Sequence, residues 1–182
     1  MKYNLDWIKK QYSYEERIKY IFFWGHRPSK DGSITASCMS QWWIADFEVD
    51  NITYKSAEHW MMAEKARLFK DEEILEKIIN CESPAEAKKL GRTVRDFVPE
   101  VWDEHRYEIV KKGNIYKFGQ NKNLKEYLLT TKNRVLVEAS PYDQIWGIGL
   151  KKENKDVENP QKWRGLNLLG FALMEVRDDL YE

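Results

Sequence analysis

The chain has 182 residues, a length typical of one domain and sufficient to bury a sizeable core without disulfide or metal staples. Its 30 Lys and Arg residues balance 30 Asp and Glu residues, so no overall charge attracts nucleic acid or an anionic membrane. The N-terminal segment lacks the apolar core of a signal peptide, no apolar run approaches the roughly 20 residues that span a bilayer, and Cys38 and Cys81 lack metal-ligand spacing. We therefore expect a soluble, cytoplasmic protein with reduced cysteines.

The first half of the chain predicts an arm, a strand, a hairpin and a helix. Residues 1–19 are charged and rich in tyrosine, which indicates an N-terminal arm or peripheral helix before a strand at Tyr20–Trp24. A polar loop follows, and residues 47–54 alternate across Asp50-Asn51 as a hairpin does. Ser56 is a candidate N-cap for a helix over residues 57–69, which contain no Gly or Pro.

The second half predicts further helices and one strand. Ser83-Pro84-Ala85-Glu86 has the pattern of a capping box, and residues 99–118 have helical spacing. A short helix at 124–129 precedes a strand at Val135–Val137, and residues 166–180 form an amphipathic terminal helix. The pattern predicts a compact α+β domain, mainly helical with a small β-sheet.

The helix after Ser56 carries the first candidate site. Glu58, Met61, Met62 and Lys65 lie on one helical face, with the carboxylate and the amine about two turns apart. A substrate could lie between them, although a glutamate that supports the helix cap and a solvated lysine explain the pattern more simply. His59 lies off this face, and we expect it to form a structural hydrogen bond.

The segment after the Val135 strand carries the second candidate site. It brings the carboxylates of Glu138 and Asp143 near Trp146, Gly147 and Gly149. Glycine allows a ligand to approach the backbone and tryptophan can stack on a heteroaromatic ring, but a tight turn with a core tryptophan has the same residues.

Several cations lie where a phosphate could be held, although each alone is usually solvated. They are Arg27 and Lys30 in the early loop, Arg92 after the Ser83 helix, and Lys117 near Gln120. The sequence has no residue spacing typical of a metal site or of a catalytic triad. Its glycines do not form a dinucleotide-binding fingerprint. No metal and no cofactor are predicted.

Several segments, in order, resemble the YbiA-like or NADAR family over about residues 20–180: YKSAEHWMMAEKA, AKKLGR, KFGQNKNLKEYLL, RVLVEASPYDQIWGIG and GLNLLGFALMEVR. The resemblance implies an α+β family domain over residues 20–182 and an enzyme that cleaves N-glycosidic bonds. It places catalytic residues at Glu58, Lys65 and Asp143. It places substrate-binding residues at Trp102 and Trp146, and we add Gly147, Arg27, Arg92, Lys117 and Asn167 as candidates.

Two substrate classes follow from the resemblance. One is a phosphorylated riboflavin-pathway intermediate that joins a ribose to an aminopyrimidine; the other is ADP-ribose attached to guanine in nucleic acid. A binding module for ADP-ribose or a nucleotide with little turnover is the alternative to an enzyme. The resemblance implies no membrane partner, and the oligomeric state stays open.

Two mechanisms fit these residues. Glu58 or Asp143 could stabilise an oxocarbenium-like centre and activate water. Alternatively Lys65 could attack the anomeric carbon and form a Schiff base, with Glu58 as the proton shuttle; this route requires burial to lower the pKa of Lys65. We favour the lysine route.

Overall fold

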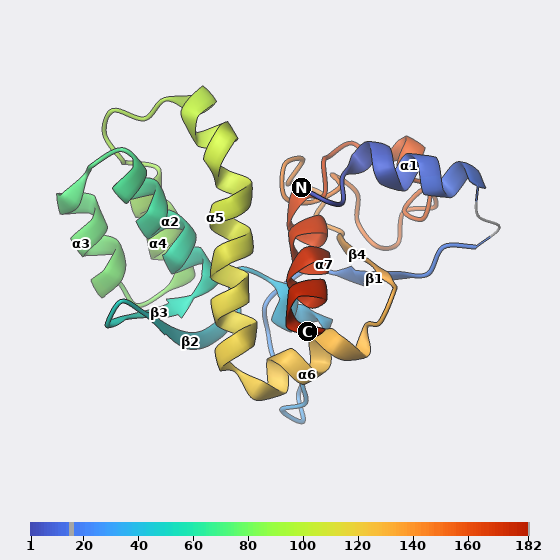
Figure 1. The fold of residues 1–182 in the computed structure, drawn as a ribbon, viewed down its shortest axis with the longest axis horizontal. Coiled ribbons are helices and arrows are strands. Elements are labelled where there is room, and N and C mark those ends of the chain that lie inside the picture. The colour runs from blue at the N-terminus through green and yellow to red at the C-terminus, as the bar shows by residue number, and fades with distance from the viewer. Residues whose placement is uncertain (15–16, 182) are drawn as a thin grey trace. The chain divides into compact units, whose positions relative to one another are not determined.

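The computed structural model describes residues 1–14 and 17–181, which form two compact units (Figure 1). The first unit comprises residues 1–40 and 126–182, and the second comprises residues 41–125. The predicted α+β class is confirmed, because helices predominate and each unit contains one two-stranded sheet.

The first unit is built on a parallel strand pair. β1 (Tyr20–Phe23) pairs with β4 (Val135–Glu138), and α7 (Leu168–Tyr181) packs on β4. Gly170 makes that packing close, because a Cβ atom there would lie 2.1 Å from the carbonyl oxygen of Leu136. The unit also contains these shorter or peripheral elements: α1 (Leu5–Tyr14), η1 (Ala36–Met39) and η2 (Pro160–Lys162).

The second unit is a hairpin followed by four helices. Its strands and helices are β2 (Ile44–Val49), β3 (Ile52–Ser56), α2 (Ala57–Leu68), α3 (Glu72–Asn80), α4 (Pro84–Gly91) and α5 (Pro99–Gln120). Asp50 and Asn51 both have positive φ angles, 51° and 62°, as a tight hairpin turn with the right-handed twist of its strands requires. Helix α2 packs against α3, α4 and α5. The remaining helix, α6 (Lys122–Thr130), runs across the boundary between the two sets of residues.

One α-helix, α3, was not predicted from the sequence. Asp71 caps it by accepting a hydrogen bond from the amide of Ile74 (3.3 Å), and Ile74, Leu75 and Ile78 are buried. The run of acids followed by apolar residues at helical spacing was the available signal. The terminal helix also begins at Leu168 and not at residue 166.

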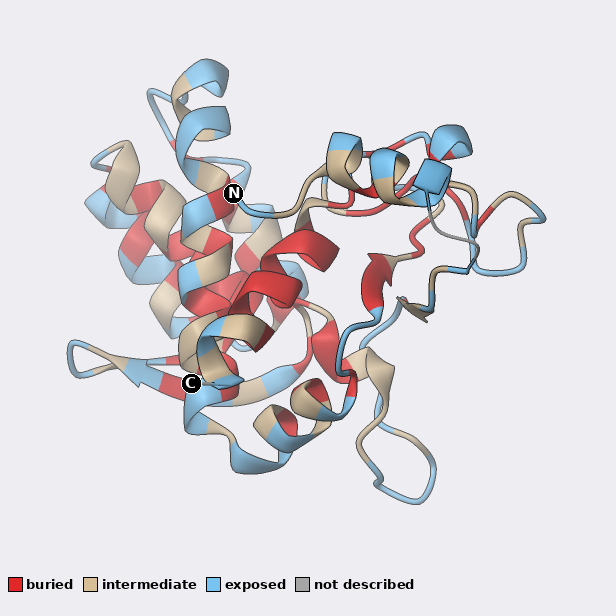
Figure 2. Cartoon of the chain, turned by 45° about the vertical axis from the view of Figure 1, so that its right-hand side comes forward, coloured by how far each residue is buried: buried red, intermediate tan, exposed pale blue. Residues whose placement is uncertain are grey.

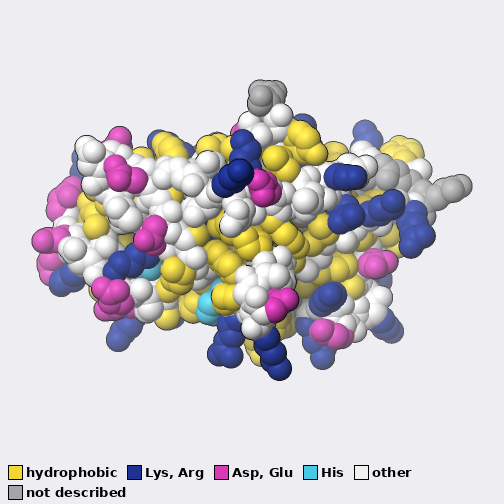
Figure 3. Space-filling view, turned by 90° about the horizontal axis from the view of Figure 1, so that it is seen from below, with side chains coloured by type: hydrophobic (Ala, Val, Ile, Leu, Met, Phe, Trp, Pro, Cys, Tyr) yellow, Lys and Arg dark blue, Asp and Glu magenta, His cyan; other side chains and the backbone are white. Residues whose placement is uncertain are grey.

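Burial follows the same division into two cores. Figure 2 shows buried residues along α7 in the first unit and along α2 in the second, where eight residues of α2 are buried. On the face drawn in Figure 3, acidic and basic side chains are interspersed, as their equal numbers suggest. Among the described residues, no helix has the length and apolar character needed to cross a membrane.

Candidate functional site

Helix α2 begins at the predicted cap. The Ser56 hydroxyl accepts a hydrogen bond from the amide of His59 (3.4 Å) and lies 2.8 Å from its Nδ1 atom. His59 is buried, and burial lowers the pKa of its imidazole. As expected, the histidine hydrogen-bonds within its own helical turn. This cap fixes the first turn of α2, which carries Glu58.

Glu58 lies in a buried polar cluster that the sequence analysis missed. Its side chain is 2% exposed, and its amide donates to the backbone oxygen of Gln41 at 2.9 Å. The side-chain oxygen of Gln41 in turn accepts from Asn114 Nδ2 on α5 at 2.8 Å. Asn114 could have been found as a polar residue at a buried position of an amphipathic helix, whereas Gln41 lies in a segment without regular periodicity. Gln41 thus links Asn114 of α5 to the backbone of Glu58.

Lys65 lies two turns further along α2 in an aromatic setting. Its Nζ donates to the carbonyl oxygen of Gly91 at 2.8 Å and lies 4.0 Å and 5.8 Å from the ring centroids of Phe97 and Trp102. Burial lowers the pKa of this amine. The structure therefore brings together two predicted site residues, Lys65 and Trp102, and adds Phe97, which the sequence analysis did not select.

The backbone around Lys65 is closely packed. A Cβ atom at Gly91 would lie 2.0 Å from the sulfur of Met62, so this glycine lets α4 approach α2 where the lysine donates. Met61 and Met62 are 5% and 7% exposed, so the face between Glu58 and Lys65 is apolar and largely buried. Such surroundings favour a neutral amine over an ammonium ion.

The two predicted phosphate-binding cations of this unit, Arg92 and Lys117, differ in exposure. Arg92 caps the C-terminus of α4 next to Gly91 and is exposed, so its guanidinium is accessible. Lys117 on α5 is fully buried. A role in holding phosphate stays a prediction for both. Lys117 could contact a phosphate only if the ligand reached the buried side chain.

The loop after β4 is organised by Asp143. One carboxylate oxygen, Oδ1, accepts from the amides of Ile145 (2.8 Å) and Trp146 (2.7 Å), and the amide of Asp143 donates to Ser140 Oγ (3.2 Å). Asp143 and Trp146 are both partly exposed. Oδ1 of Asp143 therefore stabilises the loop, and Oδ2 is left to contact a ligand.

Gly147 and Asn167 serve the packing of this loop. A Cβ atom at Gly147 would lie 2.8 Å from the carbonyl oxygen of Glu138, so its close backbone approach is to the protein itself. Asn167 is fully buried; its Oδ1 accepts from the amide of Glu138 (3.0 Å), and its Nδ2 donates to the oxygen of Leu136 (3.0 Å). These contacts give both residues a structural role, and substrate contact by either stays a prediction.

A cavity of about 290 Å³ lies at the carboxyl end of the parallel strands. Trp24, Ser37, Ala139 and Lys151 are among the residues that line it. Ligands commonly bind beyond the carboxyl ends of parallel strands. Trp24 and Lys151 are thus site candidates that were not predicted from the sequence. Neither residue lies within a recognisable motif.

The predicted site residues are divided between the units. Glu58, Lys65, Arg92, Trp102 and Lys117 belong to the second unit, and Arg27, Asp143, Trp146, Gly147 and Asn167 belong to the first. Arg27 is exposed in the loop after β1, and its carbonyl oxygen accepts from Ser37 Oγ. Within residues 1–14 and 17–181, no three His, Cys, Asp or Glu residues are grouped to hold a metal ion.

Comparison with known proteins identifies the family. Residues 22–181 match the NADAR domain. An N-glycosidase of Acanthamoeba polyphaga mimivirus is 43% identical over 169 residues, which are 90% of this chain and 98% of the viral protein. The chloroplastic riboflavin biosynthesis protein PYRR of Zea mays is 32% identical over 149 residues, 75% of this chain but 21% of the maize protein.

A solved structure agrees with these matches. The NMR structure of the Escherichia coli protein YbiA has a TM-score of 0.71 and 28% identity, and the match covers 92% of this chain and 88% of YbiA. The resemblance expected from the sequence motifs is confirmed. Because the family match covers most of the chain and the viral relative is matched almost end to end, the chain belongs to the NADAR domain family and is an N-glycosyl hydrolase.

Proposed function

We propose that this enzyme hydrolyses the N-glycosidic bond between a phosphorylated ribose and an aminopyrimidine, as found in riboflavin-pathway intermediates. The observation that carries the proposal is the setting of Lys65, an amine whose pKa is lowered by burial, beside Phe97 and Trp102. A lysine with these neighbours is suited to nucleophilic attack next to a flat ring. The similarity to part of a maize riboflavin biosynthesis protein supports this substrate class.

The reaction begins with attack by neutral Lys65. The Nζ lone pair forms a bond to the anomeric carbon while the bond from that carbon to the base nitrogen breaks, and the base keeps the bonding electrons. The amine loses a proton and the departing base gains one, with Glu58 as the shuttle. The sugar ring opens to a Schiff base, and water then hydrolyses the imine to release the sugar and restore the amine.

Glu58 and Lys65 lie seven residues apart on α2, which corresponds to about 10 Å along the helix axis. A direct proton transfer between them is excluded at that separation unless the lysine bends back, so the substrate or a water relay must link the two groups.

Removal of ADP-ribose from guanine is a second candidate function. Trp24 and Tyr142 favour it, because their ring centroids lie 6.2 Å apart and the residues are 56% and 86% exposed. Exposed paired rings suit a base of a nucleic acid that has left its stack. The balanced net charge of the chain weighs against a long nucleic-acid footprint.

The test is incubation of the purified protein with both substrate classes, with released base and sugar read by mass spectrometry. We expect release from the aminopyrimidine ribosyl phosphate. Release only from ADP-ribosylated nucleic acid would replace the first candidate with the second. Tight binding of both without any product would leave a binding module and contradict the proposal.

Two variants test the chemistry. Lys65→Ala is expected to lower turnover by at least a thousandfold, and borohydride added during turnover of the wild type should trap a covalent adduct that Lys65→Ala does not form. Lys89→Ala is the matched control, since Lys89 is exposed on α4. Activity retained in Lys65→Ala without trapping in the wild type would eliminate the lysine route, and an undiminished rate in Glu58→Gln would remove Glu58 from the chemistry.

A further inference from the structure

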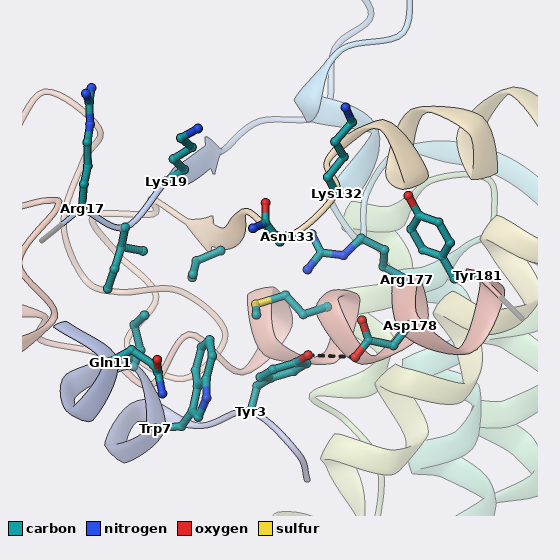
Figure 4. Close-up of a pocket in the computed structure, with 14 residues that line it drawn as sticks. Tyr3, Trp7, Gln11, Arg17, Lys19, Lys132, Asn133, Arg177, Asp178 and Tyr181 are labelled. Carbon is teal, nitrogen blue, oxygen red and sulfur yellow. Dashed lines mark hydrogen bonds between the residues drawn. The ribbon is translucent and has the colours of Figure 1, made fainter. Parts of the chain in front are cut away.

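The first unit contains a second cavity, of about 700 Å³, that includes none of the candidate site residues (Figure 4). It lies among α1, the segment that precedes β1, the turn before β4 and the part of α7 from Met174 onward. Helix α1 ends at Tyr14, before the NADAR match begins at residue 22. This cavity is therefore closed by a part of the chain that the family domain does not include.

Positive charge predominates among the described residues that line the cavity. Arg17, Lys19 and Lys132 are exposed, and none of them forms an ion pair with another described residue. Glu15 and Glu16, which precede Arg17 in the sequence, lie outside the described residues.

Asp178 is the only acid among the described lining residues, and it is already engaged. Its Oδ2 accepts from Lys2 Nζ at 2.5 Å and from the Tyr3 hydroxyl at 2.8 Å; Figure 4 draws the Tyr3 bond. The lining cations are therefore left without a carboxylate partner in the described chain.

Arg177 is the buried cation of this cavity. The residue is 3% exposed, and its Nη1 donates to Thr131 Oγ1 (2.9 Å) and to the carbonyl oxygen of Arg134 (2.8 Å). No described carboxylate lies within ion-pair distance of it, and burial lowers the pKa of its guanidinium although the nearby charge of Asp178 opposes that shift. A buried charge without a counter-ion is costly, and a bound anion would supply one. Figure 4 shows the guanidinium pointing toward Asn133 inside the cavity.

Aromatic residues provide the opposite wall. Tyr3 and Trp7 line the cavity from the N-terminal segment and α1, with ring centroids 4.8 Å apart in an edge-to-face arrangement. Trp7 also meets Phe171 of α7 edge-to-face at 6.4 Å, which fixes its plane. A fixed indole is a suitable stacking surface for a heteroaromatic ring.

We propose that this cavity binds a free nucleotide, with its phosphates held by Arg177, Lys19 and Lys132 and its base stacked on Trp7. The volume lies within the range of about 300–1,000 Å³ typical of small-molecule sites. Guanidinium and ammonium groups are the usual partners of phosphate oxygens. None of the candidate catalytic residues lines this cavity, and the proposal does not depend on the proposed reaction.

Isothermal titration of the full chain with ADP and with inorganic pyrophosphate tests the site. We expect Lys19→Ala/Lys132→Ala to weaken ADP binding at least tenfold and Trp7→Leu to weaken ADP binding while leaving pyrophosphate binding unchanged. Lys10→Ala is the control, because Lys10 is exposed on α1 and does not line the cavity. Arg177→Met is a further variant, checked first for folding by circular dichroism.

The catalytic variant Lys65→Ala separates this site from the reaction. We expect it to bind ADP with wild-type affinity; loss of ADP binding in that variant would place the nucleotide at the catalytic site and overturn the proposal. So would the absence of ADP binding to the wild type, or wild-type affinity in Lys19→Ala/Lys132→Ala. A single-stranded oligonucleotide that binds through these residues more tightly than ADP would overturn the assignment to a free nucleotide. Failure of N-glycosidic hydrolysis would leave these titrations unaffected.

Discussion

The amine of Lys65 lies 4.0 Å from the ring centroid of Phe97. Phe97 comes from the segment that precedes α5, whereas Lys65 comes from α2. Two opposing effects meet at this contact. Burial disfavours the charged amine, and the face of an aromatic ring attracts it. The balance between them sets the fraction of Lys65 that is neutral and able to attack.

Replacing Phe97 with Leu should therefore shift the pH dependence of the reaction. Leucine keeps apolar volume but removes the ring, which stabilises an ammonium by about 0.5–1 kcal/mol at exposed sites. The pKa of Lys65 should fall, so the acid limb of the kcat/KM profile should move to lower pH by the same amount. Steady-state rates between pH 5 and 9 measure the shift.

Phe69→Leu is the matched control for this change. The Phe69 ring meets the Phe97 ring edge-to-face at 5.2 Å, whereas the rings over the Lys65 amine are those of Phe97 and Trp102. We expect a smaller shift in this variant. Equal shifts in both variants would mean that general repacking, and not the ring over the amine, controls the profile.

The lowered pKa of Lys65 also predicts a pH-dependent effect on stability. The unfolded chain holds this proton more tightly than the folded one, so the cost of burying the ammonium is fully present below the folded-state pKa and disappears as pH rises toward the ordinary value of 10.5. Lys65→Met removes that cost. Its Tm relative to the wild type should be higher at pH 7 than at pH 10, as calorimetry at both values would measure.

A Tm difference that grows with pH would contradict this sign. The lost hydrogen bond from Lys65 to the oxygen of Gly91 costs about 1 kcal/mol and lowers the Tm of the variant at both values. It therefore does not change the direction of the trend. Lys89→Ala, on the exposed side of α4, should show no such trend.

Local signals in the sequence were enough to place most helices and strands, because caps, turns and periodicity depend on neighbouring residues. Ser56 caps α2 and Asp50-Asn51 turns the hairpin as predicted. The parallel pairing of Tyr20 with Val135 joins segments 115 positions apart and had no local signal. The contact of Lys65 with Phe97 is of the same kind, since it depends on how α4 and the segment after it fold back on α2.

Asp143 offers a substitution that separates loop structure from charge. Asn at this position keeps a side-chain oxygen that can accept from the amides of Ile145 and Trp146, while the charge is lost. In the lysine route Asp143 takes no part in making or breaking bonds, so we expect Asp143→Asn to retain the wild-type Tm and to raise KM more than it lowers kcat. Asp143→Ala should lower both Tm and activity.

One outcome for the Asp143 variants would contradict the expected positioning role. A fall in kcat of a hundredfold or more in Asp143→Asn, with KM and Tm unchanged, would make this carboxylate a catalytic group and favour the oxocarbenium route. Thermal unfolding and steady-state kinetics on the same preparations provide both readouts.

Asn167→Ala tests whether this residue holds β4 or contacts substrate. The substitution leaves the amide of Glu138 and the carbonyl oxygen of Leu136 without their side-chain partner, and each unmade buried bond costs about 1–3 kcal/mol. Asn167 also has a φ of 54°, a conformation that alanine adopts less readily than asparagine. We therefore expect a destabilisation of about 2–5 kcal/mol by urea unfolding, with KM unchanged in the folded fraction. Asn167→Gly relieves the backbone but still lacks the amide, so it should recover only part of the loss. An unchanged free energy of unfolding together with a raised KM would instead make Asn167 a substrate-binding residue.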